Sequence, residues 1–340
     1  MSTPSPKPAA APPPDPAPWH TGHLDVGDGH RLYYEQCGKP DGVPALVLHG
    51  GPGSGCNPRM RSLLDPQGFR VVLFDQRGCG RSTPRGACAA NHTDALVADI
   101  ERLREHLGIA RWLVFGGSWG ASLGVAYCAR HAGACLGAIL RGVFLTGRAD
   151  IDWFFNGAAA LAPRAWQRLA ALAPGPRRDA LAAWYCEAAG GDDTALAHEA
   201  VARWVAWEEA LMRADSPPTE GGRPDETALR ARLDKYRVQA HYLRHECFIG
   251  ETELLRRAAT IAELPVAILH GCDDRICRTE NAVKLAAALP GARLQRVAGA
   301  GHSPFDAPMH AALLAAGRHF LARGEFADWP PSSSAGTPGS

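Results

Sequence analysis

The chain has 340 residues, of which 46% are hydrophobic and 21% charged, and its formal net charge at pH 7 is +1. These values are typical of a soluble globular protein, and a charge so close to zero favours neither a nucleic-acid partner nor a solvated acidic tail. No stretch approaches the roughly 18 apolar residues of a membrane span, and the Pro-rich beginning lacks the apolar segment of a secretory signal. We therefore expect a cytoplasmic protein that binds neither nucleic acid nor membranes.

The ten cysteines show no sign of a metal site, because no two of them have the C-x-x-C spacing. Free and mostly buried thiols in a reducing compartment are the simplest interpretation. We expect no metal ion and no cofactor.

The composition divides the chain into a folded unit and two ends of biased composition. Residues 1–18 are rich in Pro and Ala, and residues 327–340 in Pro, Ser and Gly, so we expect both to be disordered. Between them, short apolar runs alternate with helical patterns, which predicts an α/β fold with a mostly parallel sheet. Residues 148–257 break this alternation with an Ala-, Arg- and Trp-rich segment. We interpret it as a helical insertion into one core made of residues 19–147 and 258–326.

Several elements of that core can be placed in chain order. Apolar residues at helical spacing predict helices over 94–107, ended by Gly108, and over 119–131. Strands that are covered on both faces are apolar almost throughout. That pattern, after a first β-rich run at 31–35, predicts strands at 45–49, 70–75, 112–115, 266–270 and 294–297.

Residues 116–120, Gly-Gly-Ser-Trp-Gly, match the G-x-S-x-G pattern of a nucleophile elbow centred on Ser118. A predicted strand precedes the pattern and a predicted helix follows it, which is the context that exposes a serine at a sharp turn. Glycines two positions before and after Ser118 leave room for the backbone to cross closely. The alternative is a glycine-rich turn without chemistry.

A serine hydroxyl needs a neighbouring base to become a nucleophile. His302 is the candidate, because it lies in a Gly-rich loop after the last predicted strand, where parallel sheets place their sites. An acid between the serine and the histidine in the chain should orient the imidazole. Asp273 and Asp274 both follow the strand at 266–270, and their spacing does not choose between them.

Two backbone N–H groups should stabilise the negative oxygen that forms when the serine attacks a carbonyl. We expect one from Trp119, the residue after the serine. The other should come from the loop HGGPG at 49–53, at Gly51, where glycines let the backbone approach a substrate.

Motifs spread along the chain add to these residues: HGGPG at 49–53, DQRGCGRS at 75–82, GGSWG at 116–120, RGVF and DWFF within 141–155, W-x-x-WE at 204–208, HG-x-x-D at 270–274 and GAGHS at 299–303. Together they resemble the proline iminopeptidases, the prolyl aminopeptidases of the α/β-hydrolase superfamily, over about residues 22–321. The resemblance implies an α/β-hydrolase fold, a helical cap over the site and a catalytic triad of Ser118, Asp274 and His302. The DQRGCGRS segment is expected to be mainly structural.

The same resemblance implies the substrate-binding residues. The family removes an N-terminal proline from a peptide, and cap carboxylates bind the charged terminal amine. Glu208 matches the first carboxylate, whereas Gln239 stands at the position of the second. Phe144 matches a wall of the proline pocket, and Phe155 stands where a tyrosine is expected. Cys277 matches a family cysteine near the site.

We therefore expect a serine aminopeptidase that releases N-terminal proline from peptide substrates through an acyl-enzyme. Gln239 leaves open a related esterase or amidase whose amine site is lost or altered. A non-catalytic protein of the same fold is a further alternative, which the presence of all three triad residues disfavours. The sequence gives no indication of the oligomeric state.

Overall fold

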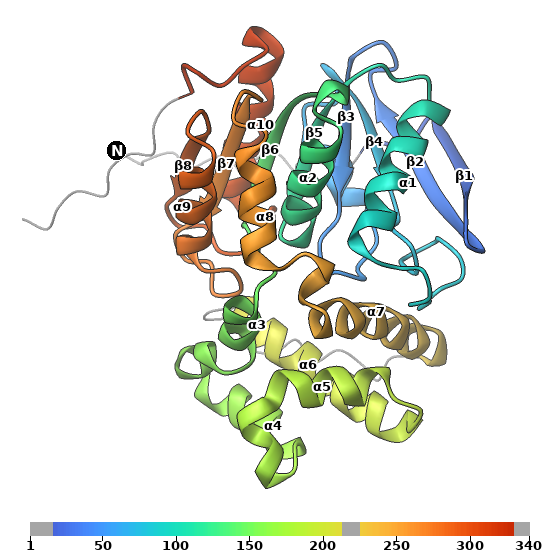
Figure 1. Ribbon diagram of the computed structural model, residues 1–340, viewed down its shortest axis with the longest axis vertical. Coiled ribbons are helices and arrows are strands. Elements are labelled where there is room, and N and C mark those ends of the chain that lie inside the picture. Colours follow the sequence, from blue (N-terminus) through green and yellow to red (C-terminus); the bar gives the residue numbers. More distant parts are fainter. Residues whose placement is uncertain (1–15, 213–224, 330–340) are drawn as a thin grey trace, which may run out of the picture.

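The computed structural model describes residues 16–212 and 225–329, and within these ranges an eight-stranded sheet forms the centre of the core (Figure 1). Its strand order is β1-β2-β4-β3-β5-β6-β7-β8, antiparallel between β1 and β2 and between β2 and β4, and parallel elsewhere. The strands are β1 His20–Gly27, β2 His30–Gly38, β3 Val43–Leu48, β4 Phe69–Phe74, β5 Trp112–Gly117, β6 Cys135–Arg141, β7 Val266–Gly271 and β8 Arg293–Val297. The predicted α/β class is thus confirmed.

The sequence patterns missed two of these strands. β1 is an edge strand whose side chains are mostly exposed, so it lacks the apolar run of a buried strand. β6 is buried but follows a helix rich in Ala and Gly without a break in composition. Small residues occur in both kinds of element, and they hide the boundary between them.

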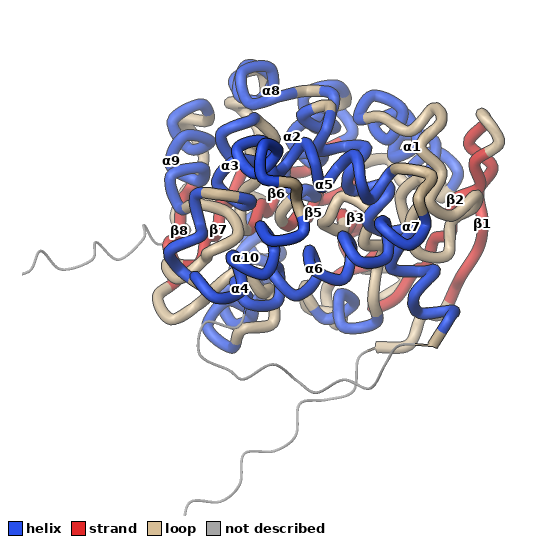
Figure 2. The backbone as a smooth tube through the Cα atoms, turned by 90° about the horizontal axis from the view of Figure 1, so that it is seen from below, coloured by secondary structure: helices blue, strands red, loops and turns tan. Residues whose placement is uncertain are grey.

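Helices cover both faces of the sheet (Figure 2). Four helices pack on one face: α1 Thr93–His106, α2 Trp119–Arg130, α8 Gly250–Ala259 and α9 Thr279–Ala288. α10 Ala307–Arg323 covers the other face. Side chains alternate between the two layers along β3, where Leu46 and Leu48 join the first and Ala45 and Val47 the second.

The insertion forms a separate helical layer below the sheet in the view of Figure 1. Its core is strongly aromatic, and Phe155, Tyr185 and Trp204 contact one another with ring centroids 4.9 to 6.1 Å apart. Trp204 and its aromatic neighbours therefore hold the helices of this segment together. The helices are α3 Arg148–Phe155, α4 Pro163–Leu172, α5 Leu181–Gly190, α6 Thr194–Met212 and α7 Glu226–Arg244. Short 3-10 helices occur at Pro58–Ser62, Ala132–Ala134, Gly157–Leu161, Gly175–Ala180 and Glu246–Phe248.

Two predicted boundaries need correction. The insertion was expected to reach residue 257, but α8 lies on the sheet, with Leu254 and Ala258 buried in the main core. The C-terminal tail was expected to begin at 327, but Trp329 is 5% exposed and packs against His319 of α10. In both places buried apolar side chains extend the core. The rest of that tail and residues 1–15 of the expected N-terminal tail lie outside the described residues.

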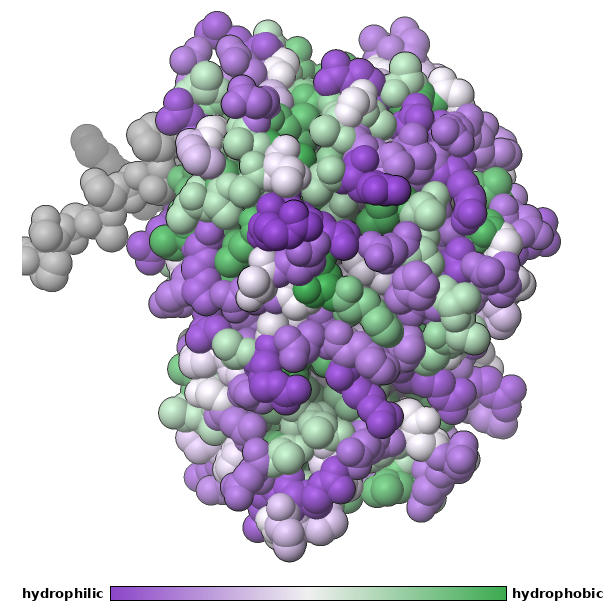
Figure 3. All heavy atoms as spheres, viewed as in Figure 1, coloured by the Kyte–Doolittle hydropathy of each residue, from purple (hydrophilic) through white to green (hydrophobic). Residues whose placement is uncertain are grey.

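On the face of the molecule shown in Figure 3, hydrophilic residues cover most of the surface, and hydrophobic residues lie among them. In the described part of the chain, no helix has the length and hydropathy required to cross a membrane. All ten cysteines are free thiols, and most of them are buried, as predicted.

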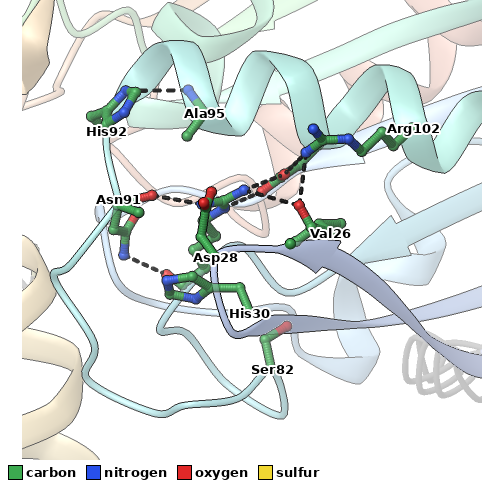
Figure 4. Close-up of polar contacts among 12 residues, drawn as sticks. Val26, Asp28, His30, Ser82, Asn91, His92, Ala95 and Arg102 are labelled. Atoms are coloured by element: carbon green, nitrogen blue, oxygen red, sulfur yellow. Dashed lines mark hydrogen bonds and ion pairs between the residues drawn. The ribbon is translucent and has the colours of Figure 1, made fainter.

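The segment at 75–82 connects the sheet to its surroundings through buried ion pairs. Arg77 donates to both carboxylate oxygens of Asp99 at 2.6 and 2.8 Å, and both side chains are almost fully buried. Arg77 also contacts Asp28, and Asn91 donates to the Arg77 carbonyl at 2.9 Å (Figure 4). This arrangement supports the prediction that the segment is structural, because it joins the β1–β2 turn to α1.

We predict that Asp99→Asn lowers the free energy of unfolding by about 3–5 kcal/mol, because it leaves the buried Arg77 charge without its main partner. Asp94→Asn is the matched control on the same helix, since Asp94 is 70% exposed and its ion pair with Arg257 should contribute less than about 1 kcal/mol. Urea unfolding followed by circular dichroism measures both. Equal effects of the two substitutions would contradict a dominant role for the buried pair.

Candidate active site

Ser118 occupies a sharp turn between the end of β5 and the start of α2. Its φ of 59° and ψ of −125° are rare for a residue other than glycine, so the turn is held in place by its surroundings. A Cβ atom on Gly116 would lie 2.1 Å from the Gly120 carbonyl oxygen, and one on Gly120 would lie 2.2 Å from that of Leu48. The two flanking glycines are therefore required by the close crossing of the chain, as the G-x-S-x-G pattern predicted.

His302 and Asp274 meet beside this turn. The His302 Nδ1 atom lies 2.8 Å from Asp274 Oδ2, while Asp273, the other candidate acid, is exposed to solvent. Because a carboxylate can only accept, Nδ1 carries the proton and Nε2 is left as the basic nitrogen. Spacing alone did not choose between the two aspartates, and Asp274, the one that the family resemblance implies, is the one that contacts His302.

The environment of Asp274 keeps it ionised. Its other oxygen, Oδ1, accepts from the backbone N–H groups of Ile276 and Cys277 at 3.0 and 2.9 Å. Burial alone raises the pKa of this carboxyl, but the charge and hydrogen bond of His302, together with the backbone donors, hold that pKa below its ordinary value. Asp274 is therefore suited to stabilise an imidazolium on His302.

A cavity of about 210 Å³ lies at the interface between the cap and the carboxyl ends of the strands. Ser118 and His302 both line it, so the two residues share one space with side chains of the cap. Its remaining lining residues are Gly50, Gly51, Ser54, Arg141, Phe144, Asp150, Ile151, Phe154, Phe155, Glu208, Met212, Gln239, Leu243, Ile276, Cys277 and Pro304.

The loop predicted to contribute to an oxyanion hole lies against the elbow. A Cβ atom on Gly50 would come within 3.2 Å of the Ser118 Cβ, and the next residue, Gly51, lines the cavity with a φ of 117° that favours glycine. Trp119 is the first residue of α2, where a helical N–H has no partner within the helix. The Trp119 indole donates to Gln76 Oε1 at 2.9 Å, which fixes this residue in the core.

The residues expected to bind substrate all line the cavity. Glu208 Oε2 accepts a hydrogen bond from the Tyr236 hydroxyl at 2.8 Å. Gln239 is 8% exposed, and its Oε1 is buried with no hydrogen-bond partner among the described residues. Phe144 and Phe155 contribute aromatic surface. Two polar groups and an apolar wall therefore face the same space.

Cys277 lies close to the nucleophile. Its thiol is fully buried and interacts with the Ser118 hydroxyl. Burial, with the nearby Asp274 charge, raises the pKa of this thiol well above its ordinary value, so that it remains protonated. Cys277 thus shapes the site rather than competing with Ser118 as a nucleophile.

Two residues near the site were not singled out from the sequence as functional. Arg141, at the end of β6, is 6% exposed, donates to the His302 carbonyl oxygen and lines the cavity. Asp150 accepts from Arg278 and from the Leu145 N–H, which anchors the connection from β6 to the cap. Arg141 is the first residue of the RGVF motif, but the motif did not indicate that the arginine side chain lies beneath the His302 loop.

No group of three or more His, Cys, Asp or Glu side chains in residues 16–212 and 225–329 has the arrangement of a metal site.

Comparison with known proteins identifies the family of the chain. A sequence model of the alpha/beta hydrolase fold family matches residues 44–307, so the chain belongs to that family. It is 44% identical to the proline iminopeptidase of Xanthomonas citri over 298 residues, which cover 86% of this chain and 94% of that protein. It is 41% identical to the proline iminopeptidase of Arabidopsis thaliana over 307 residues, which cover 88% of this chain and 79% of that protein. Within the α/β hydrolases, the chain therefore belongs to the proline iminopeptidase family.

A solved structure agrees with this placement. The proline iminopeptidase-related protein of Thermus thermophilus superposes with a TM-score of 0.57 at 28% sequence identity, covering 89% of this chain and 97% of that one. The likeness extends over the core and the cap together. The resemblance inferred from the motifs is thus confirmed at the level of the family.

We predict that Asp274→Asn lowers kcat by about 10⁴-fold, because an amide favours the wrong tautomer of His302. Asp273→Asn is the adjacent control and should stay within about twofold of the unsubstituted protein, because its side chain is exposed and does not contact His302. Steady-state hydrolysis of an activated substrate measures both variants. A large loss in Asp273→Asn with little change in Asp274→Asn would overturn the assignment of the acid.

Proposed function

We propose that this protein is a serine aminopeptidase that releases N-terminal proline from peptides. The observation that carries the proposal is the shared cavity, which combines Ser118 and His302 with the carboxylate of Glu208 and the apolar wall of Phe144. The family relatives named proline iminopeptidase support the same activity. Peptides with a free N-terminal proline are the proposed substrates.

Recognition of the terminal amine follows from the polar groups of the cap. A protonated secondary amine has two N–H donors and one positive charge, which would be very costly to bury without a partner. Glu208 supplies a negative charge, and its position is fixed by the hydrogen bond from Tyr236. The unpaired Gln239 Oε1 supplies a second acceptor without a charge. Together they match the number of donors on an N-terminal proline.

The proposed reaction proceeds in two steps. His302 Nε2 takes the proton from the Ser118 hydroxyl as the oxygen attacks the carbonyl of the proline residue. The N–H groups of Gly51 and Trp119 stabilise the resulting oxyanion, and Asp274 stabilises the imidazolium. His302 then protonates the leaving nitrogen of the peptide. Water, activated by the same imidazole, releases proline from the acyl-enzyme.

The substrate preference tests this proposal directly. We predict rapid hydrolysis of Pro-β-naphthylamide and at least about a hundredfold lower kcat/KM for N-acetyl-Pro-β-naphthylamide, whose acyl group removes the charge that Glu208 pairs with. p-Nitrophenyl acetate serves as the control for an intact triad. Preference for the ester or for the blocked substrate would indicate a related esterase or amidase with an altered amine site.

We predict that Glu208→Gln raises KM for Pro-β-naphthylamide by about 10–100-fold, which corresponds to the loss of a charged hydrogen bond. Gln239→Glu should have the opposite effect on the free-amine substrate and lower KM by a few fold, because it adds a second negative charge to the pocket. Glu209→Gln is the matched control, since Glu209 is exposed and adjacent in sequence. Unchanged KM values in both pocket variants would mean that the amine binds elsewhere.

A further inference from the structure

A second imidazole lies beneath the acid of the proposed triad. His270, near the end of β7, is fully buried and is not among the residues that line the cavity. A buried imidazole is stable only if its polar nitrogens are matched by partners. Both ring nitrogens of His270 have backbone hydrogen-bond partners, one at Val143 and one at Cys277.

The partners of His270 fix its protonation state. Its Nδ1 lies 3.2 Å from the backbone nitrogen of Val143, which can only donate, so Nδ1 is the acceptor. Its Nε2 lies 2.9 Å from the carbonyl oxygen of Cys277, which can only accept, so Nε2 carries the proton. Burial lowers the pKa of His270, in agreement with a neutral ring. Two backbone groups thus select one neutral tautomer.

The Nε2–H of His270 also faces the acid itself. It lies 3.5 Å from Asp274 Oδ2, the same oxygen that accepts from His302 at 2.8 Å. The residue whose carbonyl it holds, Cys277, donates its own N–H to Asp274 Oδ1. His270 therefore restrains the turn from Asp274 to Cys277 from below, while the turn holds the carboxylate.

The other side of the ring reaches the wall of the cavity. Val143, whose N–H it accepts, immediately precedes Phe144. The Val143 carbonyl is held in turn by Asn281 at 3.1 Å. One buried ring consequently connects the acid of the site to the segment that carries its aromatic wall.

We propose that His270 is a positioning residue for the catalytic acid: its Nε2–H orients the Asp274 turn, and its Nδ1 ties that turn to the Phe144 segment. It contacts neither the cavity nor the reacting atoms, so it acts through Asp274. The proposal rests on the triad of the proposed function, although not on the preference for proline.

Two substitutions of His270 distinguish the contact of Nδ1 with Val143 from the contact of Nε2 with Cys277. In His270→Asn the amide oxygen can occupy the position of Nδ1 and accept from Val143, but no donor reaches Cys277. In His270→Gln the amide nitrogen can reach the position of Nε2 and donate to Cys277. We expect His270→Asn to lower kcat by about 10–100-fold with little change in KM, because the acid is displaced. His270→Gln should retain most of kcat and raise KM.

Labelling of Ser118 by a fluorophosphonate makes the test independent of the substrate. The labelling rate should fall in His270→Asn in parallel with kcat, and should recover in His270→Gln. His30→Gln is the control for burial, because His30 is 2% exposed, bonds the Ala89 carbonyl and does not line the cavity; it lies near Asp28 (Figure 4). Its labelling rate should match that of the unsubstituted protein, even if its melting temperature falls.

Three results would overturn the proposal. The first is a wild-type labelling rate in His270→Asn. The second is equal loss in both His270 variants in proportion to their melting temperatures. The third is a His270 ring protonated on Nδ1 in the unmodified protein. Carbon chemical shifts of labelled histidine report this tautomer whether or not the variants fold, and we expect them to show a neutral ring protonated on Nε2. A failure of the triad itself would look different, since the unmodified protein would not label at Ser118.

Discussion

The turn at Ser118 imposes the closest backbone packing in the site, and the other parts of the site are arranged around it. A serine with positive φ can be held there only because β5 leads directly into α2 and because the chain crosses itself at Gly116 and Gly120. This crossing leaves the hydroxyl at the carboxyl edge of the sheet. The loops that follow β3, β6, β7 and β8 begin at the same edge, so the parallel arrangement of these strands brings their residues together.

Buried charge is the second constraint on this site. Asp274 remains ionised under the cap because it is surrounded by donors: one imidazole, two backbone N–H groups and a second imidazole at longer range. The same principle underlies the proposal that Glu208 pairs with the terminal charge of the substrate.

The cap and the core are connected by polar contacts as well as by chain. Asp150 of α3 binds Arg278 and Asn281 of the core, and His241 of α7 contacts the Asn91 carbonyl. These contacts hold the cap, with its Gln239, over the serine.

Much of this molecule could be predicted from short patterns, because buried parallel strands and the serine turn leave strong local signals. The apolar runs of β3, β4, β5 and β7 and the glycines around Ser118 result from contacts that are close in sequence or uniform along an element. The exposed edge strand β1, the Ala- and Gly-rich start of β6 and the place of α8 on the sheet lacked such signals. The family motifs already indicated Asp274. The burial of Asp274 beside the exposed Asp273, the turn of Arg141 beneath His302 and the orientation of His270 depend on partners more than a hundred residues away, or on which side of a turn is buried. Only the tertiary structure determines these, since burial and long-range hydrogen bonds are properties of the folded chain rather than of any local stretch.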